Sequence, residues 1–274
     1  MRVSKATKIV TYLLCVVLSF YFLFPFIWMI LTAVKSEGEI FTYPPKFFPD
    51  TWRFHNFIDA WNAQPFGRFT WNSVLVTVWT TAGQVVSASL AAYGFARYQF
   101  RGKKFLFSIL LATMMLPWDV TMIPQYMEFN LLGWIDTLKP LIIPALFGSA
   151  YYIYLMRQFL ESMPNDFAES AKIDGANEFQ IYSRIYMPMM KPCIILVCVL
   201  NMITVWNDYL GPLVFTNTQS KYTLAVGLAA FKGVHSTDII PIMCISILMC
   251  IPPVVAFFIE QKNIIEGISG GVKG

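Results

Sequence analysis

Long apolar stretches alternate with polar segments along the chain. A helix needs about 20 apolar residues to cross roughly 30 Å of hydrocarbon. Six stretches approach or exceed that length, namely residues 9–34, 70–96, 105–123, 141–156, 193–210 and 239–259. Because lipid cannot hydrogen-bond an open backbone, membrane spans of this length must be helical. The pattern therefore predicts an all-α, polytopic membrane protein with six transmembrane helices.

Irregularities are also expected in these spans. The fourth stretch is short and has to extend into its flanks or lean on neighbouring helices. Prolines inside the stretches are expected to kink several helices; they are Pro25, Pro117, Pro144, Pro252 and Pro253. No internal repeat or second composition divides the chain, so we predict a single transmembrane domain over residues 1–274.

The composition agrees with a membrane protein and excludes other classes. Hydrophobic residues make up 57% of the chain and charged residues 13%, against roughly 25% charged residues in ordinary soluble domains. So few charges cannot cover a water-soluble surface, and the same balance excludes intrinsic disorder. The net charge of +4, without a basic run interleaved with aromatics, gives no indication of nucleic-acid binding. The five cysteines lie in apolar stretches, which favours a role as small apolar packing residues over a disulfide or a metal site.

The positive charges predict the orientation of the chain. Arg2, Lys5 and Lys8 precede the first span, which is too long for a signal peptide and is followed by no small-residue cleavage site. Placing the N-terminus in the cytoplasm also puts the basic segment 97–104 there, together with most other lysines and arginines. Six crossings then return the C-terminus to the cytoplasm. The sequence thus predicts a multi-pass protein with both termini inside the cell.

The longest cytoplasmic connection, residues 157–191, has the signals of two short helices. We expect the first helix to begin at Pro164 with Ser162 as its cap, and to end at Gly175 in a left-handed conformation. Asn177 and Gln180 form a capping box that begins the second helix, which runs to about Pro188.

These two helices are expected to turn apolar side chains toward the cytosol. The side chains are those of Phe167, Ala171, Phe179 and Tyr182. Apolar faces outside the bilayer require a partner surface, so one interpretation is a docking element. The alternative is an amphipathic hairpin that lies on the membrane surface.

The motif within this connection favours docking. Residues 169–176 read E-S-A-K-I-D-G-A and residues 185–188 read I-Y-M-P. This resembles the EAA loop of binding-protein-dependent ABC importer permeases, E-A-A-x-x-x-G followed after nine residues by I-x-L-P. The spacing is kept, and Ser170 and Met187 are mild departures from the pattern.

Three further segments resemble the carbohydrate importer family, in particular its MalG-type subunit. They are R-Y-Q-F-R-G-K at 97–103, W-N-D-Y-L-G-P-L at 206–213 and E-G-I-S-G-G-V-K-G at 266–274. The resemblance implies a carbohydrate permease in a bacterial inner membrane, working as a heterodimer with a second permease subunit. It further implies two cytoplasmic ABC ATPase subunits and an external or periplasmic substrate-binding protein.

The resemblance also implies roles for particular residues. Those expected to couple to the ATPase are Glu169, Ser170, Ala171, Asp174, Gly175, Ala176, Phe179, Ile185 and Pro188. In the cytoplasmic tail 260–274, Gly270, Gly271 and Lys273 are expected to contact the ATPase. The chain itself is expected to bind no cofactor or metal and to be no enzyme, since ATP and magnesium would bind in the partner.

The motifs and charged residues of the chain indicate that a partner protein supplies the energy for transport. No G-x-x-x-x-G-K-[ST] loop and no common hydrolase motif occurs in the sequence. The predicted spans also lack acidic residues, lysine or histidine near mid-depth, where ion-coupled carriers usually place them. An ion-coupled secondary sugar carrier nevertheless stays open as an alternative, as does a structural permease subunit without its own substrate contacts.

Neutral polar side chains mark a candidate substrate pathway in the second and fifth spans. They are Asn72, Thr77, Thr80, Gln84, Asn201, Thr204 and Asn207. Amides and hydroxyls can replace the water around a sugar's hydroxyl groups. The alternative is helix–helix hydrogen bonding, which we prefer for the second span; for the fifth span both interpretations stand.

Overall fold

The computed structural model describes residues 4–233 and 237–272, with only the backbone described at Ala6 and over 262–272. Within these residues every regular element is a helix, and the nearest approach to a strand is an isolated bridge between Lys232 and Thr237. The predicted all-α class is confirmed. The chain divides into two compact units, Met1–Phe66 with Leu228–Ile251 and Gly67–Gly227 with Pro252–Gly274.

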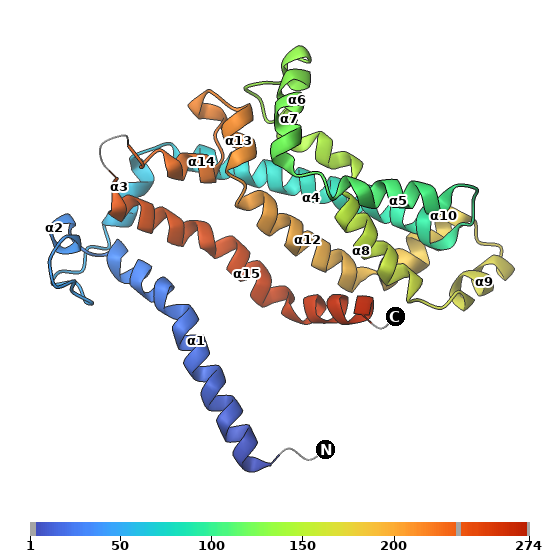
Figure 1. Cartoon of the computed structure of the whole chain (residues 1–274), viewed down its shortest axis with the longest axis horizontal. Coiled ribbons are helices and arrows are strands. Elements are labelled where there is room, and N and C mark those ends of the chain that lie inside the picture. The colour runs from blue at the N-terminus through green and yellow to red at the C-terminus, as the bar shows by residue number, and fades with distance from the viewer. Residues whose placement is uncertain (1–3, 234–236, 273–274) are drawn as a thin grey trace. The chain divides into compact units, whose positions relative to one another are not determined.

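The first unit contains the N-terminal helices and the beginning of the last helix. Its elements are α1 (Lys5–Ala33), α2 (Glu37–Ile40), α3 (Asn56–Asn62) and the first part of α15 (Ile239–Val272) (Figure 1). Ser4 caps α1 by accepting a hydrogen bond of 3.1 Å from the amide of Thr7. Helix α1 continues through Pro25, and its apolar side chains are mostly exposed, as expected of a helix that contacts lipid or another subunit.

The second unit holds most of the remaining helices. They are α4 (Phe66–Arg97), α5 (Lys103–Thr113), α6 (Trp118–Leu131), α7 (Lys139–Ile142), η1 (Pro144–Phe147), α8 (Ala150–Glu161), α9 (Asp166–Ile173), α10 (Glu178–Gln180), η2 (Ile181–Tyr186), α11 (Met187–Met189), α12 (Lys191–Trp206), α13 (Leu210–Phe215), η3 (Gln219–Lys221) and α14 (Leu224–Ala229). The first residue of α4 and the last two residues of α14 belong to the first unit.

Three helical segments of the described chain are long and apolar enough to cross a membrane alone. They are Thr7–Ala33, Phe66–Arg97 and Ile239–Gln261, which match the predicted first, second and sixth spans. Two bent helix pairs pass the same test together: Lys103–Thr113 with Trp118–Leu131, bent by 94°, and Glu178–Met189 with Lys191–Trp206, bent by 73°. Counting each bent pair once gives up to five spans, so the count of six stays a prediction.

The predicted third and fourth spans are interrupted, and the kink expected at Pro117 is a full break between two helices. Pro117 adopts an extended conformation with ψ 143° and separates α5 from α6, because it lacks an amide hydrogen and disfavours a helical residue before it. Over 141–156 the chain forms α7, the 3-10 turn η1 and then α8. The break falls at Gly148, whose φ of +83° no continuing right-handed helix can contain.

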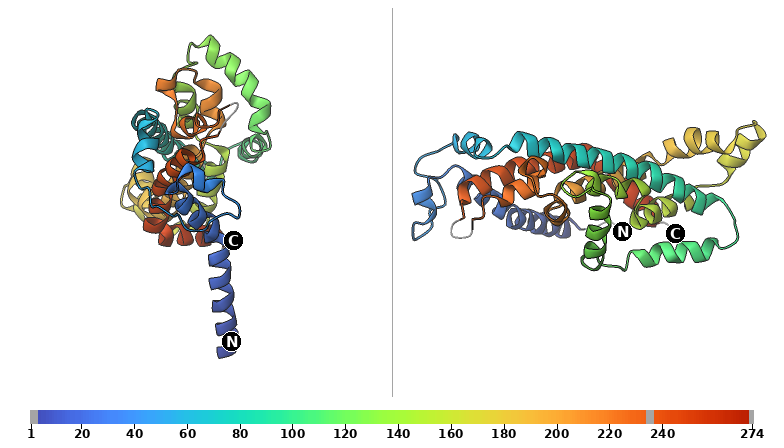
Figure 2. Two further views of the ribbon diagram at one scale, coloured as in Figure 1. Left: turned by 90° about the vertical axis from the view of Figure 1, so that its left-hand side faces the viewer. Right: turned by 90° about the horizontal axis from the view of Figure 1, so that it is seen from above.

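The core of the second unit joins membrane helices to the loop that follows α8. It includes Ala88, Ala92, Tyr93, Met156, Leu160, Ala171, Ile181, Tyr182, Tyr186, Met190, Cys193 and Val197. These residues come from α4, α8, α9, η2 and α12, together with Met190 just before α12. Loop and helices therefore share one packed interior, and Figure 2 shows the loop at the C-terminal end of α4.

Candidate coupling site

The segment Asp166–Met189 forms the predicted pair of short helices. Gly175 turns the chain between them with φ +81°, a conformation that costs other residues roughly 1–2 kcal/mol. Asn177 accepts a hydrogen bond of 2.9 Å from the amide of Gln180, and the Gln180 side chain accepts one of 2.8 Å from the amide of Asn177. The glycine corner and the capping box are confirmed. We call Asp166–Met189 the coupling loop.

The first helix of the coupling loop begins later than predicted. Helix α9 begins at Asp166, and Ser162 is the C-terminal cap of α8 instead of an N-terminal cap. The Ser162 hydroxyl donates to the carbonyl of Phe159 at 2.7 Å, which satisfies the end of the preceding helix. The second helix runs to Met189 as predicted, with a π-helical middle over Ile181–Tyr186.

Glu178 ties the coupling loop to the end of α4. Its carboxylate accepts hydrogen bonds from the hydroxyls of Tyr93 at 3.1 Å and Tyr98 at 2.9 Å. Its other oxygen lies 2.7 Å from the ammonium of Lys172 in α9. Lys172 first, and then Tyr98, hold the pKa of Glu178 below its ordinary value, and Glu178 raises the pKa of Lys172. One carboxylate therefore joins α4 to both helices of the coupling loop.

Arg97, the last residue of α4, makes a second connection. Its guanidinium donates to the carbonyls of Leu160 at 2.6 Å and Met163 at 3.1 Å, and to the side chain of Asn165. The guanidinium carbon also lies 4.5 Å from the centre of the Tyr186 ring. The planar, multiply donating guanidinium suits this position, where the end of α8, the start of α9 and η2 meet.

The outer surface of the coupling loop is apolar in part. Ile173 is 88% exposed, Phe179 71% and Phe167 47%. The expected exposure of Ala171 and Tyr182 is wrong, because both are buried in the core and the Tyr182 hydroxyl pairs with Ser89 at 2.8 Å. Of the other predicted coupling residues, Glu169, Ser170, Asp174, Gly175 and Pro188 are exposed, and Ala176 and Ile185 are partly buried.

Several residues of this site were not predicted as functional. Tyr93 and Tyr98 lie 85 and 80 positions before Glu178 in the sequence, so no local pattern could pair them with it. For Arg97 the R-Y-Q-F-R-G-K resemblance was an available signal. In the tail, Gly270 and Gly271 lie in the last turns of α15, whereas Lys273 lies outside the described residues.

The polar series of α4 is largely engaged in hydrogen bonds within the second unit. Asn72 donates to the carbonyls of Ser220 and Tyr222 at 3.0 and 2.9 Å. Gln84 accepts from the amide of Ser149, the first residue before α8, at 2.7 Å. The hydroxyl of Thr77 is buried without a partner among the described residues, while Thr80 donates to the carbonyl of Thr77 at 3.1 Å. These contacts agree with helix packing.

The polar residues of α12 differ among themselves. Asn201 is buried and donates to Thr81 at 2.8 Å and, more weakly, toward Thr80 at 3.4 Å. Thr204 and Asn207 are exposed and donate to carbonyls of their own helix at 2.9 and 2.8 Å. Asn207 follows the end of α12. Their role in a substrate pathway stays a prediction.

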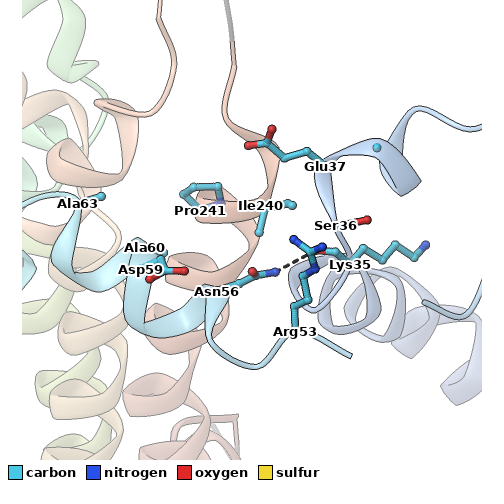
Figure 3. A pocket seen from close by; sticks show the side chains of 11 residues that line it. Lys35, Ser36, Glu37, Arg53, Asn56, Asp59, Ala60, Ala63, Ile240 and Pro241 are labelled. Atoms are coloured by element: carbon cyan, nitrogen blue, oxygen red, sulfur yellow. Dashed lines mark hydrogen bonds between the residues drawn. The ribbon is translucent and has the colours of Figure 1, made fainter. Parts of the chain in front are cut away.

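A polar pocket of about 600 Å³ lies in the first unit (Figure 3). Asn56 donates to the carbonyls of Ala33 and Lys35 at 2.9 Å each, which fixes α3 to the end of α1. Lys35 itself is 2% exposed, with its ammonium 2.5 Å from the carbonyl of Lys46 and 4.7 Å from the centre of the Trp28 ring. Charges of both signs line the rest of the pocket, from Glu37, Arg53 and Asp59.

Comparison with solved structures identifies related folds. The fold resembles a chain from the crystal structure of a bacterial ABC transporter involved in the import of the acidic polysaccharide alginate, with a TM-score of 0.82, 23% identity, and coverage of 96% of this chain and 99% of that one. An inward-facing MetNI methionine ABC transporter is similar at a TM-score of 0.59 and 14% identity, covering 74% of this chain and 95% of that one. The chain therefore shares its fold with chains of these two ABC transporters.

Sequence comparison then gives the family. Residues 84–231 match the model of the binding-protein-dependent transport system inner membrane component. The melibiose/raffinose/stachyose import permease protein MelC of Bacillus subtilis is 31% identical, with 99% of this chain and 98% of that protein covered. The lactose transport system permease protein LacG of Rhizobium radiobacter is 28% identical, with 98% and 97% covered. The chain belongs to this family of inner-membrane components, and is a non-catalytic permease subunit whose ATPase is a separate protein.

Proposed function

We propose that the chain is one permease subunit of an importer for a carbohydrate, paired with a second, different permease subunit. Two ABC ATPase subunits bind on the cytoplasmic side and hold the ATP and magnesium, and an external binding protein delivers the sugar. The names of relatives that align over nearly the whole chain support a carbohydrate substrate. The distribution of lysine and arginine supports cytoplasmic termini.

The observation that carries the proposal is the two-sided character of the coupling loop. Its inner face belongs to the core of the second unit, whereas Phe167, Ile173 and Phe179 are exposed on its outer face. Exposed apolar side chains beyond the ends of the spans require a partner. The ATPase fits as that partner, because the chain carries no nucleotide-binding loop and has to take its energy from elsewhere.

Coupling then follows from the contacts of Glu178 and Arg97. When ATP closes the ATPase dimer, the loop moves with it, and the hydrogen bonds to Tyr93, Tyr98 and the end of α8 pass the displacement to α4. Helix α4 has 32 residues, which is about 48 Å at 1.5 Å per residue. A continuous helix of that length can move groups at both faces of the membrane together.

Cross-linking tests the partner. In a chain whose own cysteines are replaced, Phe179→Cys is expected to cross-link to a cysteine in the ATPase when the assembled importer is treated with a bifunctional reagent. Ala171→Cys is the control on the same loop, because its side chain is 9% exposed and points into the core. Failure of Phe179→Cys to capture the ATPase, or its labelling by an impermeant reagent outside intact cells, would overturn the coupling role.

Uptake measurements test the substrate and the energy source. Vesicles that hold the two permease subunits, with the ATPase inside and the binding protein outside, are expected to accumulate melibiose, raffinose or lactose only when they contain ATP. The same vesicles without ATPase, given a proton or sodium gradient, test the ion-coupled alternative. Accumulation driven by the gradient alone would contradict the proposal.

A further inference from the structure

A partly open cavity lies in the second unit at the opposite end of α4 from the coupling loop. Its volume is about 280 Å³, equal to roughly nine water molecules at about 30 Å³ each. Ser73, which lines it, and Arg97, which holds the coupling loop, are 24 residues apart on the same helix, or about 36 Å. The cavity and the coupling loop therefore belong to opposite faces of the membrane.

The lining of this cavity combines apolar walls with a few polar groups. Leu141, Pro144, Val205, Pro212 and Phe215 supply apolar surface. Ser73, Gln125, Asp208 and Thr223 supply polar groups, and Trp118 supplies an indole. Apolar walls with a small number of converging polar groups are typical of small-molecule sites.

Two buried hydroxyl groups in the wall of this cavity keep unused hydrogen-bonding capacity. Thr223 is 5% exposed, and its hydroxyl has no hydrogen-bond partner among the described residues. Ser73 accepts a hydrogen bond of 2.8 Å from the amide of Leu224 through its hydroxyl oxygen, so its hydroxyl hydrogen stays available. Buried polar groups in native proteins are nearly always paired, so the unpaired Thr223 hydroxyl is an exception in the wall of this cavity.

Asp208 is the one charged residue among those that line the cavity. One carboxylate oxygen accepts a hydrogen bond of 3.1 Å from the amide of Gly211. A side chain at position 211 would place its Cβ 2.5 Å from the other oxygen, so it would displace the carboxylate from this position. The Gly211 amide thereby helps to hold the Asp208 carboxylate in place. No lysine, arginine or histidine is among the residues that line the cavity.

We propose that this cavity is a subsite for one uncharged sugar unit of the imported substrate; this rests on the proposed function. Asp208 accepts hydrogen bonds from neighbouring sugar hydroxyls, Ser73 and Gln125 bind further hydroxyls, and Trp118 packs against the apolar face of the ring. A carboxylate with no cation beside it repels acidic or phosphorylated sugars. The subunit therefore selects a neutral sugar and makes its own contacts with the substrate.

The experiment uses the complete importer in nanodiscs, labelled with 5-fluorotryptophan and followed by fluorine NMR. The Trp118 resonance is assigned with Trp118→Phe. Melibiose, raffinose and lactose are the neutral probes, sodium glucuronate is the acidic probe and choline chloride the cationic one. We expect a neutral sugar to shift the Trp118 resonance in a saturable manner, and glucuronate and choline to leave it unchanged.

Two variants separate binding from folding. Asp208→Asn keeps an acceptor for the Gly211 amide but weakens a charged hydrogen bond, so its Kd for the neutral sugar is expected to rise about tenfold or more. Gln125→Leu removes an amide for which no hydrogen bond is found among the described residues, and is expected to weaken binding without affecting assembly. Asp119→Asn is the matched control, since Asp119 is exposed on α6 and does not line the cavity.

The outcomes distinguish this site from the proposed function. If the importer accumulates a neutral sugar but no neutral probe moves the Trp118 resonance, the subsite is overturned while the proposed function stands. A response to choline or glucuronate alone overturns the assigned ligand class. If no neutral sugar is accumulated, the proposed carbohydrate function itself fails. An equal effect of Asp119→Asn and Asp208→Asn also overturns the subsite.

Discussion

Tyr98 donates a hydrogen bond of 2.9 Å to Glu178, and so connects the residue that follows α4 with the first residue of the second helix in the coupling loop. The same carboxylate reaches Lys172 in the first helix. Because these partners come from the end of α4 and from α9, a change at this one side chain alters how the loop is held without removing any core residue.

We expect Glu178→Gln to uncouple ATP hydrolysis from transport. The amide keeps a hydrogen-bond acceptor for the tyrosines but loses the ion pair with Lys172. Because both side chains of this ion pair are substantially exposed, folding and assembly are expected to be nearly unaffected. The stimulation of ATPase activity by loaded binding protein should fall by roughly 5- to 10-fold, while basal ATPase activity is retained.

Asp166→Asn is the control for that measurement, because Asp166 is exposed on the same loop. It is expected to preserve stimulation by the loaded binding protein. Wild-type stimulation in Glu178→Gln, in a complex of normal abundance, would show that the carboxylate does not transmit the motion.

The pH dependence of the Glu178–Lys172 pair has a definite sign. The folded pKa of Glu178 lies below its ordinary value of 4.5, so its stabilising contribution is complete above that value and is lost as pH falls through the folded pKa. The pKa of Lys172 is raised above 10.5, so its contribution is complete below that value and is lost as pH rises through the folded pKa. The pair is therefore intact from about pH 5 to about pH 10.

NMR of carbon-13-labelled glutamate carboxyl groups can check this titration, with the Glu178 signal assigned from Glu178→Gln. We expect a midpoint below 4.5 in the wild-type chain, shifted upward in Lys172→Met because Lys172 is the largest cause of the depression. A midpoint that is equal in the two proteins would contradict the role given to Lys172.

Gly175→Ala should impair coupling through backbone strain alone. No atom lies within 4 Å of the position a Cβ would occupy, so the substitution introduces no clash, but φ +81° costs an alanine about 1–2 kcal/mol. The loop can relieve this strain by changing the angle between its two helices. We expect normal membrane insertion with reduced sugar uptake in vesicles.

Gly133→Ala provides a matched comparison, since Gly133 has φ +66°, equally open surroundings and a position outside the coupling loop. Similar strain there should leave uptake close to the wild-type value. Equal losses in the two variants would mean that general destabilisation, rather than the shape of the loop, explains the effect.

Sequence reasoning succeeded where the determining interactions are local. Gly175 and the Asn177–Gln180 box act over three or four residues, and their geometry could be predicted from residue type and spacing. It also identified the long apolar helices, because hydropathy over about 20 residues decides whether a segment spans lipid.

It failed where distant packing decides the outcome. Helix α1 continues through Pro25, whereas the chain breaks into separate helices at Pro117 and near Gly148. Which of these residues interrupts a helix depends on the residues packed around it, and these cannot be identified from the local sequence. Likewise, Ala171 and Tyr182 were assigned to the outer face although both belong to the core. On short helices with apolar residues on several sides, periodicity alone cannot select the buried face.

The last prediction concerns Asn201, for which sequence left helix packing and substrate contact as equal alternatives. Its amide is buried and donates to the Thr81 hydroxyl at 2.8 Å, so Asn201→Ala removes a hydrogen bond between α12 and α4 and leaves its partner without a donor. We expect a loss of stability of about 1 kcal/mol, measured as a lower Tm of the purified complex, with an unchanged KM for sugar uptake. Asn207→Ala removes an exposed amide that donates to the carbonyl of Ile203 in the preceding turn, and should leave Tm close to the wild-type value. A raised KM in Asn201→Ala at unchanged Tm would instead place this amide in the substrate pathway, because a packing contact affects the amount of folded transporter and not its affinity for sugar.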